Sequence, residues 1–188
     1  SNSMTQTKID LSTYDNTWYQ PGSKVKRLFW YFFNSLILKN GWLPFSSLRI
    51  WGLKIFGASI GNNVVIKPGV SVKYPWKLHI GNNCWIGENV WIDNLDEVTL
   101  EDNVCISQGA LLLCGNHNYK SKAFDLMIAP ILIKEGAWIG ANCSIAPGIV
   151  LESHAVLTMG STATTHLEAY GIYTGNPAVK VKLRQLYK

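Results

Sequence analysis

The sequence predicts an all-β fold, a solenoid of short strands coiled into a three-sided prism, with a helical extension at its N-terminus. Three observations support this prediction: an aliphatic residue recurs at every sixth position, turn-forming residues separate these positions, and breaks in the register fall at regular intervals. A period of six fits neither an α-helix nor simple strand alternation. It is typical of a solenoid whose coils stack their apolar side chains inward.

The six-residue register begins at Ile60 and supplies the expected core. Its members are Ile60, Ile66, Val72, Ile80, Ile86, Ile92, Leu100, Ile106, Leu112, Ile133, Ile139, Ile145, Leu151 and Leu157. Four positions after most of them comes a second small or apolar residue: Val64, Val70, Cys84, Val90, Val104, Ala110, Ala137, Cys143, Ile149 and Ala155. We expect both sets to point into the prism.

Turn residues mark the expected corners. Asparagine precedes several members of the second set, at Asn63, Asn83, Asn89, Asn103 and Asn142, and asparagine adopts left-handed backbone angles at low cost. The register is lengthened after Val72, after Ile92 and, by the long segment 113–132, after Leu112. If three repeats make one coil, all three insertions leave the same corner, where a solenoid usually places its binding site.

Composition limits the classes of protein. The chain has 188 residues, of which 47% are hydrophobic and 15% charged, so it suits one folded domain with an extension rather than a disordered chain. The formal charge of +5 arises near the two ends of the chain, which is unlike a nucleic-acid-binding face. The four cysteines form no CxxC pair and no signal peptide precedes them, so we expect a reduced, cytoplasmic compartment.

Three segments carry a family resemblance that covers about residues 53–184: IGNNVVIKPGVSVKYPWKLHIGNNCWIGENVWI, CGNHNY and GNPAVKVKLR. They resemble the hexapeptide-repeat acyltransferases, most of all the colanic-acid-biosynthesis acetyltransferase branch, which is related to galactoside and serine acetyltransferases. The resemblance implies a left-handed parallel β-helix, a homotrimer, acetyl-CoA as co-substrate and no metal. We expect an N-terminal extension over residues 1–52, the β-helix over 53–179 with a catalytic loop at 113–132, and a basic tail at 180–188.

The long loop contains His117, and an imidazole, which ordinarily titrates at about pH 6.5, can take a proton from a hydroxyl at neutral pH. The resemblance places the general base of the family here, in a His-x-Tyr segment. It implies direct transfer, in which His117 accepts the proton of an acceptor hydroxyl as that oxygen attacks the thioester of acetyl-CoA. Asn116, Tyr119 and Glu88 are expected to contact the acceptor, although Glu88 also suits a plain turn.

Asp93, one coil below the loop, is the expected acidic partner that would fix the tautomer of His117. The alternative is that Asp93, like Asp96 and Glu97, is a solvated turn carboxylate. Cys114 lies three residues before His117, but a nucleophilic Cys-His pair needs an orienting third group and a zinc site needs more ligands. Both of those readings are disfavoured.

By the same resemblance, Trp138 lines the channel for the thioester and the pantetheine arm, or else forms a trimer contact. Ala141, Met159 and Thr164 would flank the pantetheine, and Met159 departs from the smaller residue that the family often has. The cations that would meet the 3'-phosphate and the pyrophosphate are Lys180, Lys182 and Arg184. A solvated tail is the alternative for these three.

The extension contains two aromatic segments within residues 24–56, separated by residues 41–44, and both favour helices. The longest apolar run, residues 28–38, is about half of what spans a bilayer. In one interpretation the helices cap the open end of the prism. In the other, a basic, Trp-rich helix lies at the inner face of the membrane, near lipid-linked sugars.

Together these observations predict a cytoplasmic O-acetyltransferase that uses acetyl-CoA on a sugar hydroxyl in surface polysaccharide biosynthesis. N-acetyl transfer to an amino sugar and a non-catalytic scaffold stay open. A γ-type carbonic anhydrase shares the β-helix but needs three metal-binding histidines, and His79 and His154 do not lie in a loop beside His117. The identity of the acceptor does not follow from the sequence.

Overall fold

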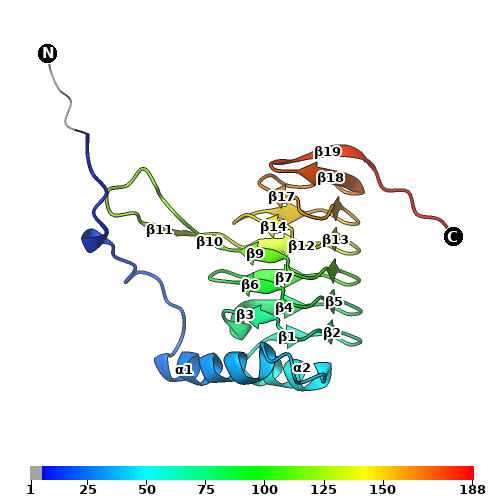
Figure 1. Cartoon of the computed structure of the whole chain (residues 1–188), viewed down its shortest axis with the longest axis horizontal. Coiled ribbons are helices and arrows are strands. Elements are labelled where there is room, and N and C mark those ends of the chain that lie inside the picture. Colours follow the sequence, from blue (N-terminus) through cyan, green and yellow to red (C-terminus); the bar gives the residue numbers. More distant parts are fainter. Residues whose placement is uncertain (1–5) are drawn as a thin grey trace, which may run out of the picture.

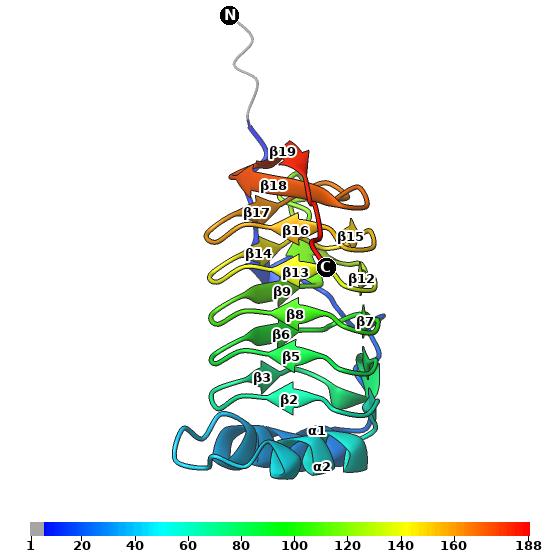
Figure 2. The same ribbon diagram turned by 90° about the vertical axis from the view of Figure 1, so that its right-hand side faces the viewer.

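The computed structural model describes residues 6–188 as a left-handed, three-sided parallel β-helix that stands on two helices (Figures 1 and 2). The first five residues of the predicted extension lie outside this range. Helix α1 (Lys24–Phe33) continues into a π-helical turn, η2 (Asn34–Leu38), and α2 (Ser46–Ile55) follows after a short loop. Two 3-10 turns, η1 (Leu11–Thr13) and η3 (Pro75–Lys77), complete the helical elements.

The three faces of the prism are parallel sheets, which we call faces A, B and C. Face A contains β1 (Ser59–Ile60), β4 (Leu78–Ile80), β7 (Val98–Leu100), β12 (Ile131–Ile133) and β15 (Val150–Leu151). Face B contains β2 (Val65–Ile66), β5 (Trp85–Ile86), β8 (Cys105–Ile106), β13 (Trp138–Ile139), β16 (Val156–Leu157), β18 (Gly171–Gly175) and β19 (Ala178–Leu183). Face C contains β3 (Ser71–Val72), β6 (Trp91–Asp93), β9 (Leu111–Leu113), β14 (Ser144–Ile145) and β17 (Thr162–Ala163).

The core confirms the six-residue register. All fourteen aliphatic residues of the register are buried, with Ile60 the most exposed at 8%, and the ten residues of the second set are buried with them. The five predicted corner asparagines all have positive φ angles, between 54° and 61°. Because asparagine tolerates this region better than most residues, the sequence marks these five corners, whereas His154 has the same conformation at a later corner without such a signal.

The three insertions leave the same corner, as predicted from their spacing. Each follows a strand of face C and precedes a strand of face A: η3 after β3, residues 94–97 after β6, and the hairpin of β10 (Gly115–His117) and β11 (Leu126–Ile128) after β9. In Figure 1 this hairpin extends away from the prism. The C–A corner is therefore the edge of the solenoid that carries extra structure.

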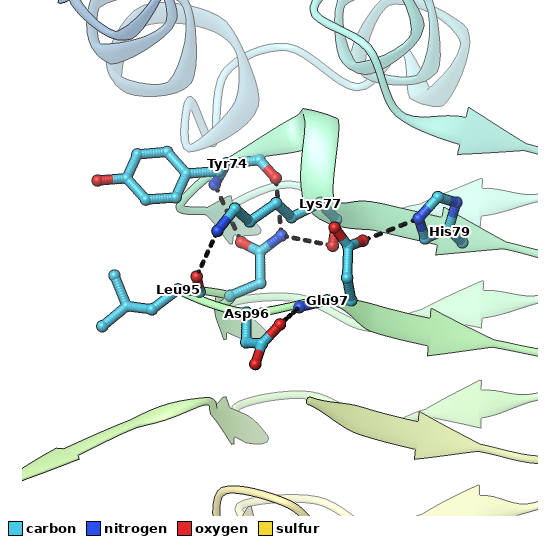
Figure 3. A network of polar contacts seen from close by, with 7 residues as sticks. Tyr74, Lys77, His79, Leu95, Asp96 and Glu97 are labelled. Carbon is cyan, nitrogen blue, oxygen red and sulfur yellow. Dashed lines mark hydrogen bonds and ion pairs between the residues drawn. The ribbon is translucent and has the colours of Figure 1, made fainter. Parts of the chain in front are cut away.

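Asn94 joins the first two of these insertions, which Figure 3 shows through Tyr74, Lys77 and Leu95. Its side chain is fully buried, accepts the N–H of Tyr74 at 2.9 Å and donates to the carbonyls of Tyr74 at 2.7 Å and Lys77 at 3.1 Å. The ammonium group of Lys77 donates in turn to the carbonyl of Leu95 at 2.8 Å. A single amide thus pairs main-chain groups that have no partner in a sheet.

Replacing Asn94 by alanine is expected to lower the free energy of unfolding by about 3 kcal/mol, because it removes three hydrogen bonds and leaves the N–H of Tyr74 and the carbonyl of Lys77 without that partner. Urea denaturation measures the change. His79→Ala is the control, since His79 and Glu97 lie 2.9 Å apart but are both about half exposed, and such a pair contributes less than about 1 kcal/mol. Equal stability of the two variants would contradict this role of Asn94.

The N-terminal helices cap the first coil, which is the first of the two interpretations given above. The indole N–H of Trp30 donates to the carbonyl of Val72 at 2.9 Å, and the side-chain oxygen of Asn34 accepts the N–H of the same residue at 3.3 Å. The hydroxyl of Ser46 accepts the N–H of Ile66 at 2.8 Å. These contacts satisfy strand edges that the first coil would otherwise expose. Helix α2 ends at Ile55, three residues beyond the expected boundary of the extension.

The opposite end is closed by a hairpin, which differs from the expected basic tail at 180–188. Strand β19 pairs antiparallel with β18 and extends to Leu183, so that residues 180–183 belong to face B. The reason is that β18 presents an open edge, and the returning chain satisfies its main-chain groups. The side chain of Lys180 is paired with Glu168, so its charge is not free as the sequence suggested.

Candidate active site

The hairpin of β10 and β11 carries His117 at the end of its first strand. The strands pair antiparallel, with His117 opposite Leu126. At the base of the hairpin, a Cβ atom at Gly115 would lie 2.5 Å from Leu95 Cδ1, so glycine allows a close approach that any other residue would open by moving the Leu95 side chain. The hairpin is thereby seated against the residues of the insertion below it.

The loop of the hairpin holds the imidazole of His117 through one of its two nitrogens. Its Nδ1 lies 2.9 Å from the carbonyl oxygen of Phe124, and the two rings stack with centroids 4.4 Å apart and planes 8° from parallel. A carbonyl oxygen can only accept, so Nδ1 carries the proton and Nε2 presents its lone pair. Nε2 is the nitrogen with which a histidine in this tautomer takes a proton from a substrate.

An N-terminal segment forms a wall beside this histidine. The ring of Tyr14 lies 5.8 Å from that of His117, centroid to centroid. The segment is attached to the hairpin through the N–H of Asp10, which donates to the carbonyl of Lys122 at 2.9 Å. The carboxylate of Asp10 also lies 4.0 Å from the ammonium group of Lys122. Residues 10–14 and the hairpin therefore form one unit around His117.

Asp93 does not orient His117 within the chain, contrary to our expectation. Among residues 6–188, the group that bonds to the ring of His117 is the main-chain carbonyl of Phe124, and no carboxylate does so. Asp93 lies at the root of the hairpin, opposite Leu113, where burial raises the pKa of its carboxyl group and Lys73 opposes that shift. The tautomer is thus fixed by the fold of the loop rather than by an acid.

Cys114 is unsuited to act as a nucleophile. Its side chain is fully buried, and burial raises the pKa of its thiol to about 12, so the thiol stays protonated at neutral pH. In the described part of the chain, no group of three or more His, Cys, Asp or Glu residues is placed to hold a metal ion.

Two of the three expected acceptor contacts share the hairpin with His117. The side-chain oxygen of Asn116 accepts the main-chain N–H of His117 at 2.8 Å, and the ring of Tyr119 is 74% exposed two residues further on. Glu88 lies instead at the B–C corner, in a shallow pocket with Lys67. In a single chain, Glu88 is therefore on a different edge from His117.

Trp138 lies on face B and points outward. Its ring is 44% exposed, and the indole N–H donates to the hydroxyl of Ser107 at 2.9 Å. Ser107 also lines a groove of about 450 Å³ along face B, together with Trp85 and Cys105. Cys105 is the neighbour of both tryptophans in the sheet register. Face B thus presents an apolar channel with two exposed indole rings.

The residues expected to flank the pantetheine are divided between two corners. Ala141 and Met159 are neighbours at the B–C corner, where the N–H of Gly160 donates to the carbonyl of Ala141 at 2.8 Å, and Met159 is exposed. They border the same face as Trp138. Thr164 follows β17 at the C–A corner, so the structure does not bring it beside them.

Of the three predicted cations, Lys182 fits the expected role best. A row of residues paired in the strand register runs across face B from Trp138 through Val156 and Ile172 to Lys182. Lys180 is paired with Glu168, and Arg184 donates to the carbonyls of Gly136 at 2.9 Å and His154 at 3.3 Å at the A–B corner. Lys182 is therefore aligned with Trp138, whereas the other two are engaged elsewhere.

His117 and Trp138 lie on opposite sides of the chain. Face B is the face opposite the C–A corner from which the hairpin leaves, and Figures 1 and 2 show the hairpin and β13 on different sides of the prism. Within one chain, His117 and the apolar groove of face B therefore do not meet.

Sequence reasoning missed Phe124 and Tyr14. Phe124 contributes through its carbonyl and has a φ of 55°, which is unusual for an aromatic residue and has no sequence signal. Tyr14 is far from the loop in sequence, and only the fold brings it there.

Comparison with known proteins agrees with this architecture. Residues 77–114 and 130–164 match the family described as hexapeptide repeat of succinyl-transferase. A putative colanic acid biosynthesis acetyltransferase of Escherichia coli K12, WcaF, is 34% identical over 168 residues, 88% of this chain and 91% of the relative. The galactoside O-acetyltransferase of E. coli K12 is 30% identical over 128 residues, 66% of this chain and 63% of the relative.

Two solved structures share the fold. A galactoside acetyltransferase in complex with coenzyme A superposes with a TM-score of 0.76 and 25% identity, over 85% of this chain and 80% of the other. A hexapeptide-repeat acetyltransferase of Vibrio cholerae in complex with acetyl coenzyme A gives a TM-score of 0.77 at 18% identity, over 85% and 87% of the two chains, and shows the fold alone. The extent of the identity to WcaF, on a β-helix built from the same repeat, shows that the chain belongs to the hexapeptide-repeat acetyltransferases.

Proposed function

We propose that this protein transfers the acetyl group of acetyl-CoA to a hydroxyl of a saccharide acceptor, with His117 as general base. The observation that carries the proposal is the hydrogen bond from Nδ1 of His117 to the carbonyl of Phe124, which leaves Nε2 as the proton acceptor. The family supplies the acyl chemistry, and relatives named for colanic acid biosynthesis and galactoside acetylation support a sugar hydroxyl.

In the proposed reaction, Nε2 of His117 takes the proton of the acceptor hydroxyl as that oxygen attacks the thioester carbonyl. The tetrahedral intermediate then collapses, the carbon–sulfur bond breaks, and the imidazolium returns the proton to the departing thiolate. The products are an acetyl ester and free coenzyme A, and the histidine ends as it began. No covalent acyl-enzyme is needed, in keeping with the protonated, buried thiol of Cys114.

Face B suits the coenzyme. Strands β13 and β19 are separated by three inter-strand spacings on face B. Trp138 and Lys182 are therefore about 14 Å apart, a length that an extended pantetheine arm can span. In this arrangement the thioester lies near Trp138, with Ala141 and Met159 beside it, and Lys182 meets the phosphates of the coenzyme.

We further propose that the active unit is a homotrimer, because a single chain leaves the site incomplete. The hairpin of one subunit would reach face B of its neighbour, bringing His117 of the first to the channel beside Trp138 of the second. A threefold axis makes this contact three times. We assign the enzyme to the cytoplasm and to surface polysaccharide biosynthesis, on the strength of the named relatives and the reduced cysteines.

The proposal is tested by incubating the purified protein with acetyl-CoA and a panel of nucleotide sugars and oligosaccharides. Free thiol release identifies the acceptor, and mass spectrometry of the product identifies an added acetyl group. Failure to bind acetyl-CoA in calorimetry would refute the proposal. Stoichiometric zinc in the purified protein would favour the carbonic anhydrase alternative.

Tyr14 is expected to contribute to acceptor binding, since its ring faces that of His117. Replacing Tyr14 by alanine should raise KM for the acceptor by about tenfold and leave KM for acetyl-CoA unchanged. Steady-state kinetics with each substrate varied in turn measure both values. Trp18→Ala, an exposed aromatic on the same segment, is the matched control. A rise in the two KM values together would contradict a role specific to the acceptor.

A further inference from the structure

Helix α1 is apolar on two opposite sides. One side packs on the first coil through Trp30 and the partly buried Phe33. The other side carries a stripe of more than half-exposed side chains with helical spacing, at Val25, Leu28, Phe29 and Phe32, and the stripe continues to Leu36 in η2. An apolar face of a helix is normally covered, by protein or by lipid. Here the fold covers one side only.

The loop before α2 and α2 itself extend this surface. Trp42 is 93% exposed and Phe45 is 61% exposed, and Trp51 and Ile55 follow one turn apart on the outer side of α2. We call this surface the basal patch: Val25, Leu28, Phe29, Phe32, Leu36, Trp42, Phe45, Trp51 and Ile55. In Figure 1, α1 and α2 together form the end of the prism, so the patch lies across that end.

The loop that presents Trp42 is held in place. The guanidinium group of Arg49 is buried and donates to the carbonyls of Leu38 at 3.3 Å, of Asn40 at 3.3 Å and of Leu43. These bonds connect the end of η2 to α2 across the loop. The exposed indole is therefore part of a preformed surface, and little ordering is needed for it to engage a partner.

The charges around the patch are of one sign. No Asp or Glu occurs between Asp15 and Glu88, whereas that interval contains nine basic residues: Lys24, Lys26, Arg27, Lys39, Arg49, Lys54, Lys67, Lys73 and Lys77. Three of them, Lys24, Lys39 and Lys54, lie exposed on the same helical elements as the patch. A second copy of the chain would bring like charges together at this surface.

We propose that the basal patch binds the surface of a bilayer that contains anionic phospholipids. Phe and Leu side chains enter the boundary of the acyl chains, the tryptophans lie at headgroup depth, and the lysines meet the lipid phosphates. No described helix is long and apolar enough to cross a membrane, so the helices lie along it. If the proposed trimer forms with its axis along the solenoids, all three patches face the same side and bind together.

The test is flotation of the full-length protein with vesicles of phosphatidylcholine alone and with vesicles that also contain phosphatidylglycerol. Binding is expected to the anionic vesicles and to weaken with added salt. Replacing Phe29, Phe32 and Trp42 together by serine should weaken it on the order of tenfold or more. Reversing Lys39 and Lys54 to glutamate should weaken it by roughly fivefold or more for each residue.

Matched controls lie elsewhere on the chain. Val179→Ser with Leu186→Ser removes exposed apolar side chains of β19 and of the C-terminal segment, and Lys8→Glu with Lys188→Glu makes the same change of net charge. Both are expected to bind like the wild type. Unchanged binding of the Phe29, Phe32 and Trp42 variant, or no binding of the wild type to anionic vesicles, would overturn the proposal. Multi-angle light scattering adds a readout: self-association that the same variant abolishes, without vesicle binding, would instead identify a second copy as the partner.

Discussion

Alanine in place of His117 is expected to lower kcat/KM for acetyl transfer by about 10²–10⁴-fold, because no positioned base then remains to take the proton of the acceptor hydroxyl. Binding of acetyl-CoA should be retained, since the proposed contacts with the coenzyme are made by Trp138 and Lys182, which the substitution leaves in place. Thiol release with saturating acetyl-CoA measures the rate, and calorimetry measures the binding. A lower rate with unchanged binding of acetyl-CoA indicates loss of a base, whereas loss of both indicates loss of the fold.

His79→Ala is the matched control for this experiment. His79 projects from β4 on face A and pairs with Glu97 rather than with a residue of the hairpin, so full activity is expected. Partial recovery of the His117→Ala enzyme by added imidazole would support a missing proton acceptor. An alanine variant that keeps more than a tenth of the wild-type rate would exclude His117 as the base, and an unchanged rate would favour the non-catalytic scaffold.

Mixed trimers of two impaired variants are expected to be more active than either variant alone. One variant carries His117→Ala. The other carries Trp138→Asp, which removes the indole ring and places a negative charge beside an anionic coenzyme, and should lower kcat/KM by about tenfold or more. If each site combines His117 of one subunit with Trp138 of the next, every trimer that contains both variants has one intact site. The selected mixed trimers then carry about one third of the wild-type number of sites, and unselected random assembly gives about a quarter.

The two chains are co-expressed with different affinity tags and purified through both, which selects the mixed trimers. The separate homotrimers, measured alone and combined after purification, provide the baseline. Size determination by light scattering establishes the number of subunits in each preparation. Activity of the mixed species no higher than the mean of the two homotrimers would show that the site lies within one chain, and the proposed contact between hairpin and face B would be wrong.

The fold was predictable from the sequence because a solenoid repeats one local rule. Each coil needs inward aliphatic residues, such as Ile86 and Ile106, and corner residues that adopt a positive φ, such as Asn83 and Asn103. Both kinds of residue can be recognised in the sequence. The single exit corner followed from the spacing alone. Likewise, the aromatic character of residues 24–56 predicted helices, and the contacts of Trp30 established that they cap the prism.

The candidate site was less predictable, because its geometry depends on contacts that no repeat encodes. The partner of His117 is a carbonyl, and every residue has one, so nothing in the sequence distinguishes Phe124 from its neighbours. The pairing of Lys180 with Glu168 arises only when β19 folds back on β18. Thr164 is close to Met159 in the sequence, but β17 lies between them, so Thr164 is at the next corner of the prism.

The reversal of the chain from β18 into β19 has a consequence for the growth of the rod. A parallel solenoid is an open template, onto which any matching coil from another molecule could add and lengthen a fibre. Strand β19 runs in the opposite direction, so on face B an incoming coil would meet an antiparallel strand where its own register needs a parallel one. Because Trp30 and Ser46 bind strands of the first coil at the other terminus, both ends of the rod differ from the repeating template.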